Sequence, residues 1–307
     1  MDNKSYPVIL TLMVPKDTKS YRHAYFICFL ALYVLILSIN IRLVMAIIME
    51  KSLHEPMYIF LGHLCINGIY GATGFYPKML SDLILDSYVI SFHMCALQIF
   101  VIYSSLLCEF TILTVMSYDR YVAICKPLDY HSRLTKNACV KLILFSCSVP
   151  TFSILTGTLL SNLRQLCAYH IDKLYCDNWS IVKLSLACRV DTIQFVVNGI
   201  FTCAINALVW FVFLSYVKIL IACKHSAQSH KKFVTTCLPH LIAFLNYVVW
   251  SLFNTLYELF GTGSLPQSFK NFLSVSFLII PPLVNPIIYG IILTPIRTKC
   301  IGIAADF

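Results

Sequence analysis

Long apolar stretches alternate with short polar segments along the whole chain. Seven of the stretches reach the roughly 20 residues that a helix needs to cross the apolar core of a bilayer. These stretches are residues 23–49, 56–80, 92–118, 138–160, 192–222, 233–257 and 269–292. The pattern therefore predicts an all-α membrane protein with one domain, a seven-transmembrane helix bundle over residues 23–292.

The composition of the 307 residues agrees with this pattern. Hydrophobic residues make up 59% of the chain, charged residues make up 12%, and the mean hydropathy is +0.78. The net charge of +9 comes from basic residues that flank the apolar stretches and form no continuous patch. Membrane lipid is therefore the expected surrounding, and no nucleic acid partner is expected.

The distribution of charge predicts the orientation. With the N-terminus outside, the cytoplasmic side carries 13 Lys and Arg against 5 Asp and Glu, whereas the outer side carries 10 against 8. Because short cytoplasmic loops are enriched in basic residues, we expect residues 1–22 to form an extracellular N-terminus and residues 293–307 a short cytoplasmic tail. Sequons for N-glycosylation begin at Asn3 and Asn178, both on the predicted outer side.

Four of the fourteen cysteines also fall on the predicted outer side: Cys95, Cys167, Cys176 and Cys188. Extracellular compartments are oxidising, so disulfides are expected there. Four cysteines allow three pairings, and their spacing does not choose between them. The other ten are expected to behave as small buried hydrophobic residues.

Glu109 is the one acidic residue inside a predicted membrane stretch. A carboxylate within the bilayer is costly, so it is expected either to be protonated and hydrogen-bonded or to coordinate a cation or a polar network. A functional role and a purely structural hydrogen bond both remain open. Asn40 and Arg42 are the polar residues of the first stretch, and they are expected to face the bundle interior or, for Arg42, the inner surface.

The third apolar stretch ends on the polar triplet Asp119-Arg120-Tyr121. An arginine side chain in a protein does not lose its proton. Beside Asp119, the guanidinium can be neutralised in one state of the protein and released to a partner in another. The triplet is therefore predicted to be part of a switch.

The seventh stretch contains a predicted hinge. Pro286 frees a backbone carbonyl and creates a pivot, and the neighbouring Asn285 can satisfy the exposed backbone. Tyr289 lies one helical turn further along. We expect its phenol group to move when the helix bends.

Five motifs carry a family resemblance that covers nearly the whole chain: Leu53–Tyr58, Met116–Cys125, Ser215-Tyr216, Lys232–Leu241 and Pro282–Tyr289. In order and spacing they resemble odorant (olfactory) receptors of the rhodopsin-like G-protein-coupled receptor superfamily. The resemblance implies a plasma-membrane receptor that binds a small organic odorant within the bundle. It also implies a heterotrimeric G protein of the stimulatory olfactory type as partner, with cyclic AMP as the product of signalling.

The resemblance further implies particular residue roles. Cys95 would pair with Cys176, and Cys167 with Cys188. Arg120, freed from Asp119, would meet the G-protein α-subunit while Tyr216 and Tyr289 rearrange around it. The implied ligand positions are Ile102, Tyr103, Leu106 and Leu107 on the third helix, Asn198, Ile200, Thr202 and Ala204 on the fifth, and Asn246 and Tyr247 on the sixth.

Two departures from the family pattern change these expectations. Gly68 stands where the family commonly has an Asp in the second helix, so the usual sodium-linked pair of carboxylates is reduced to Glu109. The segment from Lys224 to His240 contains no Asp or Glu. Asp119 is therefore the expected partner of Arg120 in the inactive state.

Three other functions are compatible with parts of this sequence. A rhodopsin-like receptor for a different small molecule shares the same motifs, although Ile102 argues against an amine receptor and the absence of a mid-span Lys in the seventh helix argues against an opsin. A transporter would use Glu109, Asn40 and Arg42 as a polar path. A structural membrane protein would give no signal. No cofactor or metal site is expected, and no grouping of nucleophile and base indicates an enzyme.

Overall fold

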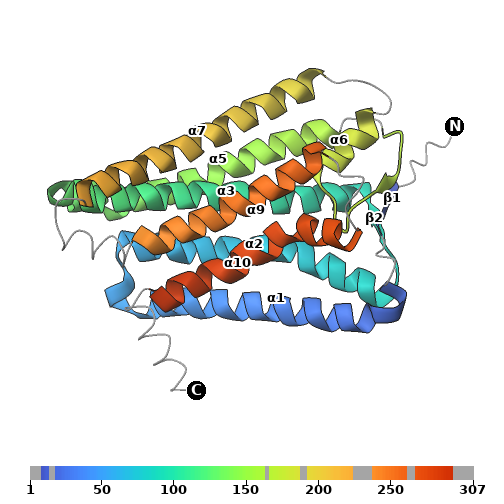
Figure 1. Ribbon diagram of the computed structural model, residues 1–307, viewed down its shortest axis with the longest axis horizontal. Coiled ribbons are helices and arrows are strands. Elements are labelled where there is room, and N and C mark those ends of the chain that lie inside the picture. The colour runs from blue at the N-terminus through green and yellow to red at the C-terminus, as the bar shows by residue number, and fades with distance from the viewer. Residues whose placement is uncertain are drawn as a thin grey trace.

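A computed structural model describes residues 8–13, 18–162, 166–186, 192–223, 237–260 and 267–292. Within these ranges, seven helices of more than 20 residues run side by side along the long axis of the molecule (Figure 1). They are α1 (Thr18–Met49), α2 (Pro56–Leu85), α3 (Phe92–Cys125), α5 (Lys136–Asn162), α7 (Thr192–Cys223), α9 (Leu238–Phe260) and α10 (Gln267–Ile292).

The long helices extend beyond several of the predicted apolar stretches. The helix α3 continues past residue 118 to Cys125, so the triplet Asp119-Arg120-Tyr121 lies inside the helix and not after it. The helix α1 already begins at Thr18. The prediction followed hydropathy, whereas backbone hydrogen bonding continues a helix through polar residues as well.

Local sequence signals set some helix ends. Pro56 occupies the first turn of α2, where its missing N–H costs nothing. The same helix ends at Asp86, whose backbone adopts the left-handed conformation with φ of 49°. The Ser91 hydroxyl accepts a hydrogen bond from the Met94 N–H and caps α3.

The helix α3 lies at the centre of the bundle. Two thirds of its most apolar 18-residue window (67%) is buried, whereas the corresponding windows of α1 and α5 are each 17% buried. Among the described residues, four helices are long and apolar enough to cross a membrane: Tyr21–Met49, Phe92–Cys125, Lys136–Leu160 and Asn271–Gly290. Two shorter apolar helical stretches are Ala207–Ala222 and Leu238–Phe253.

A small sheet covers one end of the bundle, which we call the sheet end (Figure 1). Its strands are β1 (Ile9–Leu12), β2 (Val89–Ser91) and β3 (His170–Ile171), in the order β2-β1-β3. The first strand pairs antiparallel with β2, with Leu10 opposite Ile90, and parallel with β3, with Thr11 opposite His170. The helix α6 (Asn178–Leu186) lies at the same end.

Three clusters of buried apolar side chains fill the interior. One cluster lies beneath the sheet and contains Leu10, Ile90 and the disulfide partners Cys95 and Cys176. A second, which we call the outer cluster, joins α1, α2, α3 and α10 to the loop before α6: Ile36, Ala72, Phe75, Tyr76, Met79, Leu83, Ile102, Leu174, Tyr175, Val275, Phe277 and Leu278. The third, which we call the lower cluster, extends to the opposite end and includes Met116, Tyr216, Tyr247 and Tyr289.

Three short helical segments connect the long helices at the end opposite the sheet. The 3-10 helix Lys51–Leu53 joins α1 to α2. The 3-10 helix Pro127–Asp129 and the helix α4 (Tyr130–Arg133) join α3 to α5. The second of these connections brings loop residues against the polar end of α3.

Candidate functional site

A buried ion pair between adjacent residues lies near the end of α3 opposite the sheet. Arg120 Nε donates to Asp119 Oδ2 at 2.7 Å, and Arg120 Nη2 donates to the same oxygen. Asp119 is fully buried and Arg120 is 6% exposed. Since a buried charge is costly unless it is paired, Asp119 neutralises the guanidinium in this arrangement.

Tyr130 supplies a second contact to Asp119. Its hydroxyl donates to Asp119 Oδ1 at 2.9 Å, so both carboxylate oxygens accept hydrogen bonds. Burial, followed by the negative charge of Asp119, raises the pKa of Tyr130 and keeps the hydroxyl protonated. Sequence reasoning missed Tyr130 because the residue lies 11 positions away in a connecting segment with no distinctive spacing.

The lower cluster brings the predicted switch tyrosines together. Tyr216 of α7 and Tyr289 of α10 are both buried in this cluster with Met116 of α3. The Tyr289 hydroxyl lies 3.0 Å from Nδ1 of His240 on α9. His240 is buried too, and its Nε2 has no hydrogen-bond partner among the described residues.

Two further residues near the ion pair, Tyr121 and Leu128, are exposed to different degrees. Tyr121 is half-buried, and Lys218 Nζ of α7 lies 5.8 Å from the centre of its ring. Leu128, between the ion pair and Tyr130 in sequence, is 98% exposed. Leu128 follows Pro127 in the segment between α3 and α4.

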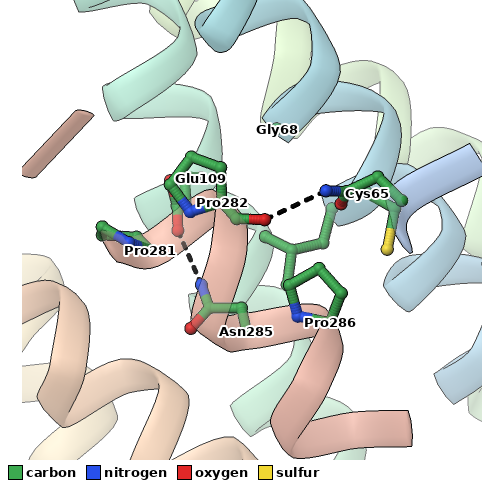
Figure 2. Close-up of a pocket in the computed structure, with 9 residues that line it drawn as sticks. Cys65, Gly68, Glu109, Pro281, Pro282, Asn285 and Pro286 are labelled. Atoms are coloured by element: carbon green, nitrogen blue, oxygen red, sulfur yellow. Dashed lines mark hydrogen bonds between the residues drawn. The ribbon is translucent and has the colours of Figure 1, made fainter. Parts of the chain in front are cut away.

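Glu109 is buried in the middle of α3 and faces α10. Asn285 Nδ2 donates to Glu109 Oε1 at 2.8 Å, as the dashed line between these two residues in Figure 2 shows. Asn40 Nδ2 of α1 donates to the Pro282 carbonyl at 3.0 Å. The predicted hinge of α10 is thus held by polar side chains from two other helices.

A small cavity lies beside Glu109, with room for about one water molecule. Figure 2 shows it between α10, α2 and α3. Its lining consists of Asn40, Leu64, Cys65, Gly68, Glu109, Pro281, Pro282, Asn285 and Pro286. The sequence placed Glu109 and Asn285 in separate roles, whereas the structure joins them at one site.

The described positions on α3 that the resemblance assigned to the ligand lie in the half of the bundle toward the sheet end. Ile102 is fully buried in the outer cluster, and Tyr103 and Leu106 pack against it. Leu107 is half-buried. The side chains of Asn198, Ile200, Thr202 and Ala204 lie outside the described part of the structure.

The two predicted ligand positions on α9 are hydrogen-bonded to the protein itself. Tyr247 donates from its hydroxyl to the Leu106 carbonyl at 3.0 Å. Asn246 Nδ2 donates to Asn285 Oδ1 at 3.3 Å, and Asn246 Oδ1 accepts from Trp250 Nε1 at 3.1 Å. Sequence reasoning did not single out Trp250.

The loop before α6 enters the bundle from the sheet end. Tyr175 is fully buried, with its ring centre 5.9 Å from that of Phe75 and 6.2 Å from that of Phe277, both at edge-on angles. Gln98 of α3 holds the adjacent backbone, because its Oε1 accepts from the Cys176 N–H at 2.9 Å. The loop thus covers the outer cluster on the side of the sheet end.

Cys95 at the start of α3 forms a disulfide with Cys176, the pairing that the resemblance implied. Cys167 is also disulfide-bonded, but its implied partner Cys188 lies outside the described residues. Asn178 is the half-buried first residue of α6, and Asn3 lies outside the described residues.

Comparison with known proteins identifies the family. A sequence model described as olfactory receptor matches residues 28–305. The chain belongs to the olfactory receptor family. Human olfactory receptor 4E2 is 32% identical over 275 residues, which cover 89% of this chain and 86% of that protein. Human olfactory receptor 4E1 is 35% identical, with coverages of 87% and 84%, and mouse olfactory receptor 5G25 is 32% identical, with coverages of 87% and 83%.

Membership of this family places the receptor in the rhodopsin-like G-protein-coupled superfamily, with a seven-transmembrane bundle. It is a multi-pass membrane protein, and its lipid-facing surface is visible in exposed apolar side chains such as Ile27, Leu144, Phe145 and Phe152, each at least 60% exposed. The family is one of receptors and not of enzymes. Odorants and G proteins are the general classes of partner that it implies.

Beside Glu109, the described lining of the cavity contains Gly68 and no second carboxylate, at the place of the sodium-linked pair that the sequence predicts to be incomplete. A Cβ atom at Gly68 would make ordinary contacts, 3.4 Å from Asn40 Oδ1 and 3.6 Å from Pro282 Cβ. The Asn285 amide donates to Glu109 and so presents a hydrogen atom where a cation would need an oxygen. Glu109 in this receptor is thus a hydrogen-bond acceptor for α10.

Proposed function

We propose that the receptor binds a small organic odorant in the half of the bundle nearest the sheet and activates a stimulatory olfactory-type G protein, which raises cyclic AMP. The observation that carries the proposal is the buried Asp119–Arg120 pair at the opposite end of the same central helix. Ligand and partner would therefore act on the two ends of α3.

The sheet end supplies the chemistry for an odorant. The outer cluster is almost entirely apolar and aromatic, and Tyr175 of the loop closes it from above. Apolar sites with few polar groups bind small, mostly uncharged organic molecules. Ile102 belongs to this cluster, and Tyr103 and Leu106 pack against it. The other proposed ligand positions are Leu107 on α3, Asn246 and Tyr247 on α9, and Asn198, Ile200, Thr202 and Ala204 on α7.

The opposite end supplies a restrained switch. The carboxylate of Asp119 holds Arg120, and Tyr130 holds the carboxylate. Release of Arg120 would present a permanent positive charge to the C-terminal helix of the G-protein α-subunit. Tyr121, Tyr216, Asn285, Pro286 and Tyr289 would rearrange around it, and the exposed Leu128 would contact the same partner.

Features of both ends support the proposed orientation. In the proposed orientation the sheet, the disulfide and the sequons at Asn3 and Asn178 face outward, where disulfides form and glycans are added. The tail of residues 293–307 and the basic loops then face the cytoplasm. We place the receptor in the plasma membrane, where it meets volatile or water-soluble ligands.

The test is a panel of small volatile and water-soluble compounds applied to cells that express the receptor, with cyclic AMP as readout. We expect at least one compound to raise cyclic AMP in wild-type cells and to fail with Arg120→Ala at equal surface expression. Activation only by non-volatile compounds would indicate a receptor for another small molecule. Ligand-driven uptake or current without a G protein would refute the proposal in favour of a transporter.

A further inference from the structure

Three hydrogen bonds join four side chains from α9, α10 and α3 into one line. Trp250 Nε1 donates to Asn246 Oδ1 at 3.1 Å, and Asn246 Nδ2 donates to Asn285 Oδ1 at 3.3 Å. Asn285 Nδ2 then donates to Glu109 Oε1 at 2.8 Å. Each amide accepts at its oxygen and donates at its nitrogen, so the bonds all run in one direction, from Trp250 to Glu109.

The two ends of this line lie in different parts of the receptor. Trp250 packs against the outer cluster, which contains Ile102 and Tyr175, and its ring centre is 6.2 Å from that of Phe272. Asn285 precedes Pro286 at the hinge of α10, beside the cavity in Figure 2. Among the described residues, Asn246 is the side chain that bonds to both Trp250 and Asn285.

The position of Asn246 is costly without these partners. It is a half-buried amide within an apolar helix, and an amide in a membrane segment is unfavourable unless its polar atoms are hydrogen-bonded. Tyr247, the next residue, bonds to the Leu106 carbonyl of α3 instead. The two neighbours thus tie α9 to different helices, and Asn246 is the residue of the described part of α9 that bonds to Asn285.

We propose that Asn246 is a positioning residue that couples Trp250, at the proposed ligand region, to Asn285 at the hinge of α10. The inference rests on the proposed function. In the resting receptor the line holds α9 against α10 and fixes the Asn285 amide on Glu109. A ligand that displaces the Trp250 ring breaks the first bond, and the freed Asn246 amide then releases Asn285.

Two substitutions remove adjoining links of the line. Asn246→Leu removes both bonds at the centre, and Trp250→Phe removes the indole N–H but keeps an aromatic ring. The assay uses purified full-length receptor with purified stimulatory heterotrimeric G protein and no added ligand, and it measures the rate of nucleotide exchange. Val249→Ala is the matched control, since Val249 lies between them in sequence and is 43% exposed on the outer face of α9.

Each single variant is expected to raise ligand-free exchange about fivefold, in the range of couplings between sites in one protein. The double variant is expected to raise it no further, because both changes interrupt the same line. Val249→Ala should behave as wild type. A purely structural role for Asn246 would lower the unfolding temperature without raising exchange, so thermal unfolding is measured on the same samples.

Two results would overturn the inference. If the single effects multiply in the double variant, or if exchange is unchanged in folded Asn246→Leu and Trp250→Phe receptors, then the residues do not act through one another. Trp250→Phe keeps the test available if Asn246→Leu does not fold. If the folded wild-type receptor promotes no exchange with this G protein either alone or with the compound panel, the proposed function fails, and the inference with it.

Discussion

The hydroxyl of Tyr130 donates to the carboxylate of Asp119 at 2.9 Å and thereby ties α4 to the ion pair of α3. The contact gives a residue outside the polar triplet a part in restraining Arg120. It also makes the restraint sensitive to any movement of the segment between α3 and α5.

Tyr130→Phe is expected to raise ligand-free signalling. The change removes a hydrogen bond to a charged group, which contributes about 1.5–3 kcal/mol in proteins, and leaves Asp119 Oδ1 without this donor. The resting state should lose more than the active state, because in the resting state this bond holds the carboxylate that neutralises Arg120. Basal cyclic AMP, normalised to surface expression, should increase at least about threefold, a modest share of that energy.

Arg133→Ala is the matched control for Tyr130→Phe. Arg133 lies in the same helix α4 and pairs with Asp129, but both side chains are about half exposed. Exposed ion pairs contribute little, so basal signalling should not change. Equal effects of the two substitutions would mean that α4 acts through its general stability and not through Asp119.

Gly71→Ala is expected to destabilise the receptor. A Cβ atom at Gly71 would collide with Ser105 Oγ and lie 3.0 Å from Ser105 Cβ. Ser105 has little freedom to move away, because its hydroxyl donates to the Asn67 carbonyl at 3.2 Å. Crowding of a packed interior costs about 1–3 kcal/mol, and thermal unfolding of the purified receptor should show the loss as a lower midpoint.

Gly157→Ala provides the opposite case on α5. Nothing lies within 4 Å of a Cβ atom built at Gly157, and alanine is favoured over glycine in a helix by up to about 1 kcal/mol. The unfolding midpoint should therefore stay unchanged or rise. A fall as large as that of Gly71→Ala would show that crowding against Ser105 is not the cause of the loss at Gly71.

Glycan mapping tests the orientation independently of signalling. With the sheet end outside the cell, the sequons at Asn3 and Asn178 meet the glycosylation machinery. Asn3→Gln is expected to lower the glycosylated mass, and peptide N-glycosidase should remove the remaining difference. Asn178 lies half-buried at the start of α6, so Asn178→Gln should have a smaller effect. Modification of a site introduced between α3 and α5 would contradict the orientation.

The bundle itself could be predicted because each spanning helix carries its own signal, a long apolar run. The ends of the helices could not, because helical hydrogen bonding continues through charged residues such as Asp119 and Arg120 after the hydropathy signal has stopped. The Cys95–Cys176 bond came from family resemblance, since the spacing of four cysteines left three pairings open.

The candidate site was only partly visible in the sequence. Asp119, Arg120 and Asn285 stand out as polar residues in apolar surroundings, but the partners of Glu109 and Asn246 depend on how helices distant in sequence pack together. Tyr130, His240 and Trp250 gave no signal of their contacts for the same reason. The sheet was missed because its strands have two to four residues, too few for an alternating pattern to be recognised.

The order of the strands in the sheet has a consequence for biosynthesis. The middle strand, β1, is the first to leave the ribosome, but its neighbours β2 and β3 come much later in the chain. Residues 9–11 can pair with β2 only after α1 and α2 have been translated, and Thr11 and Leu12 can pair with His170 and Ile171 only after α3 and α5 have followed. A strand that is translated before α1 is thus completed only when the chain has passed α5.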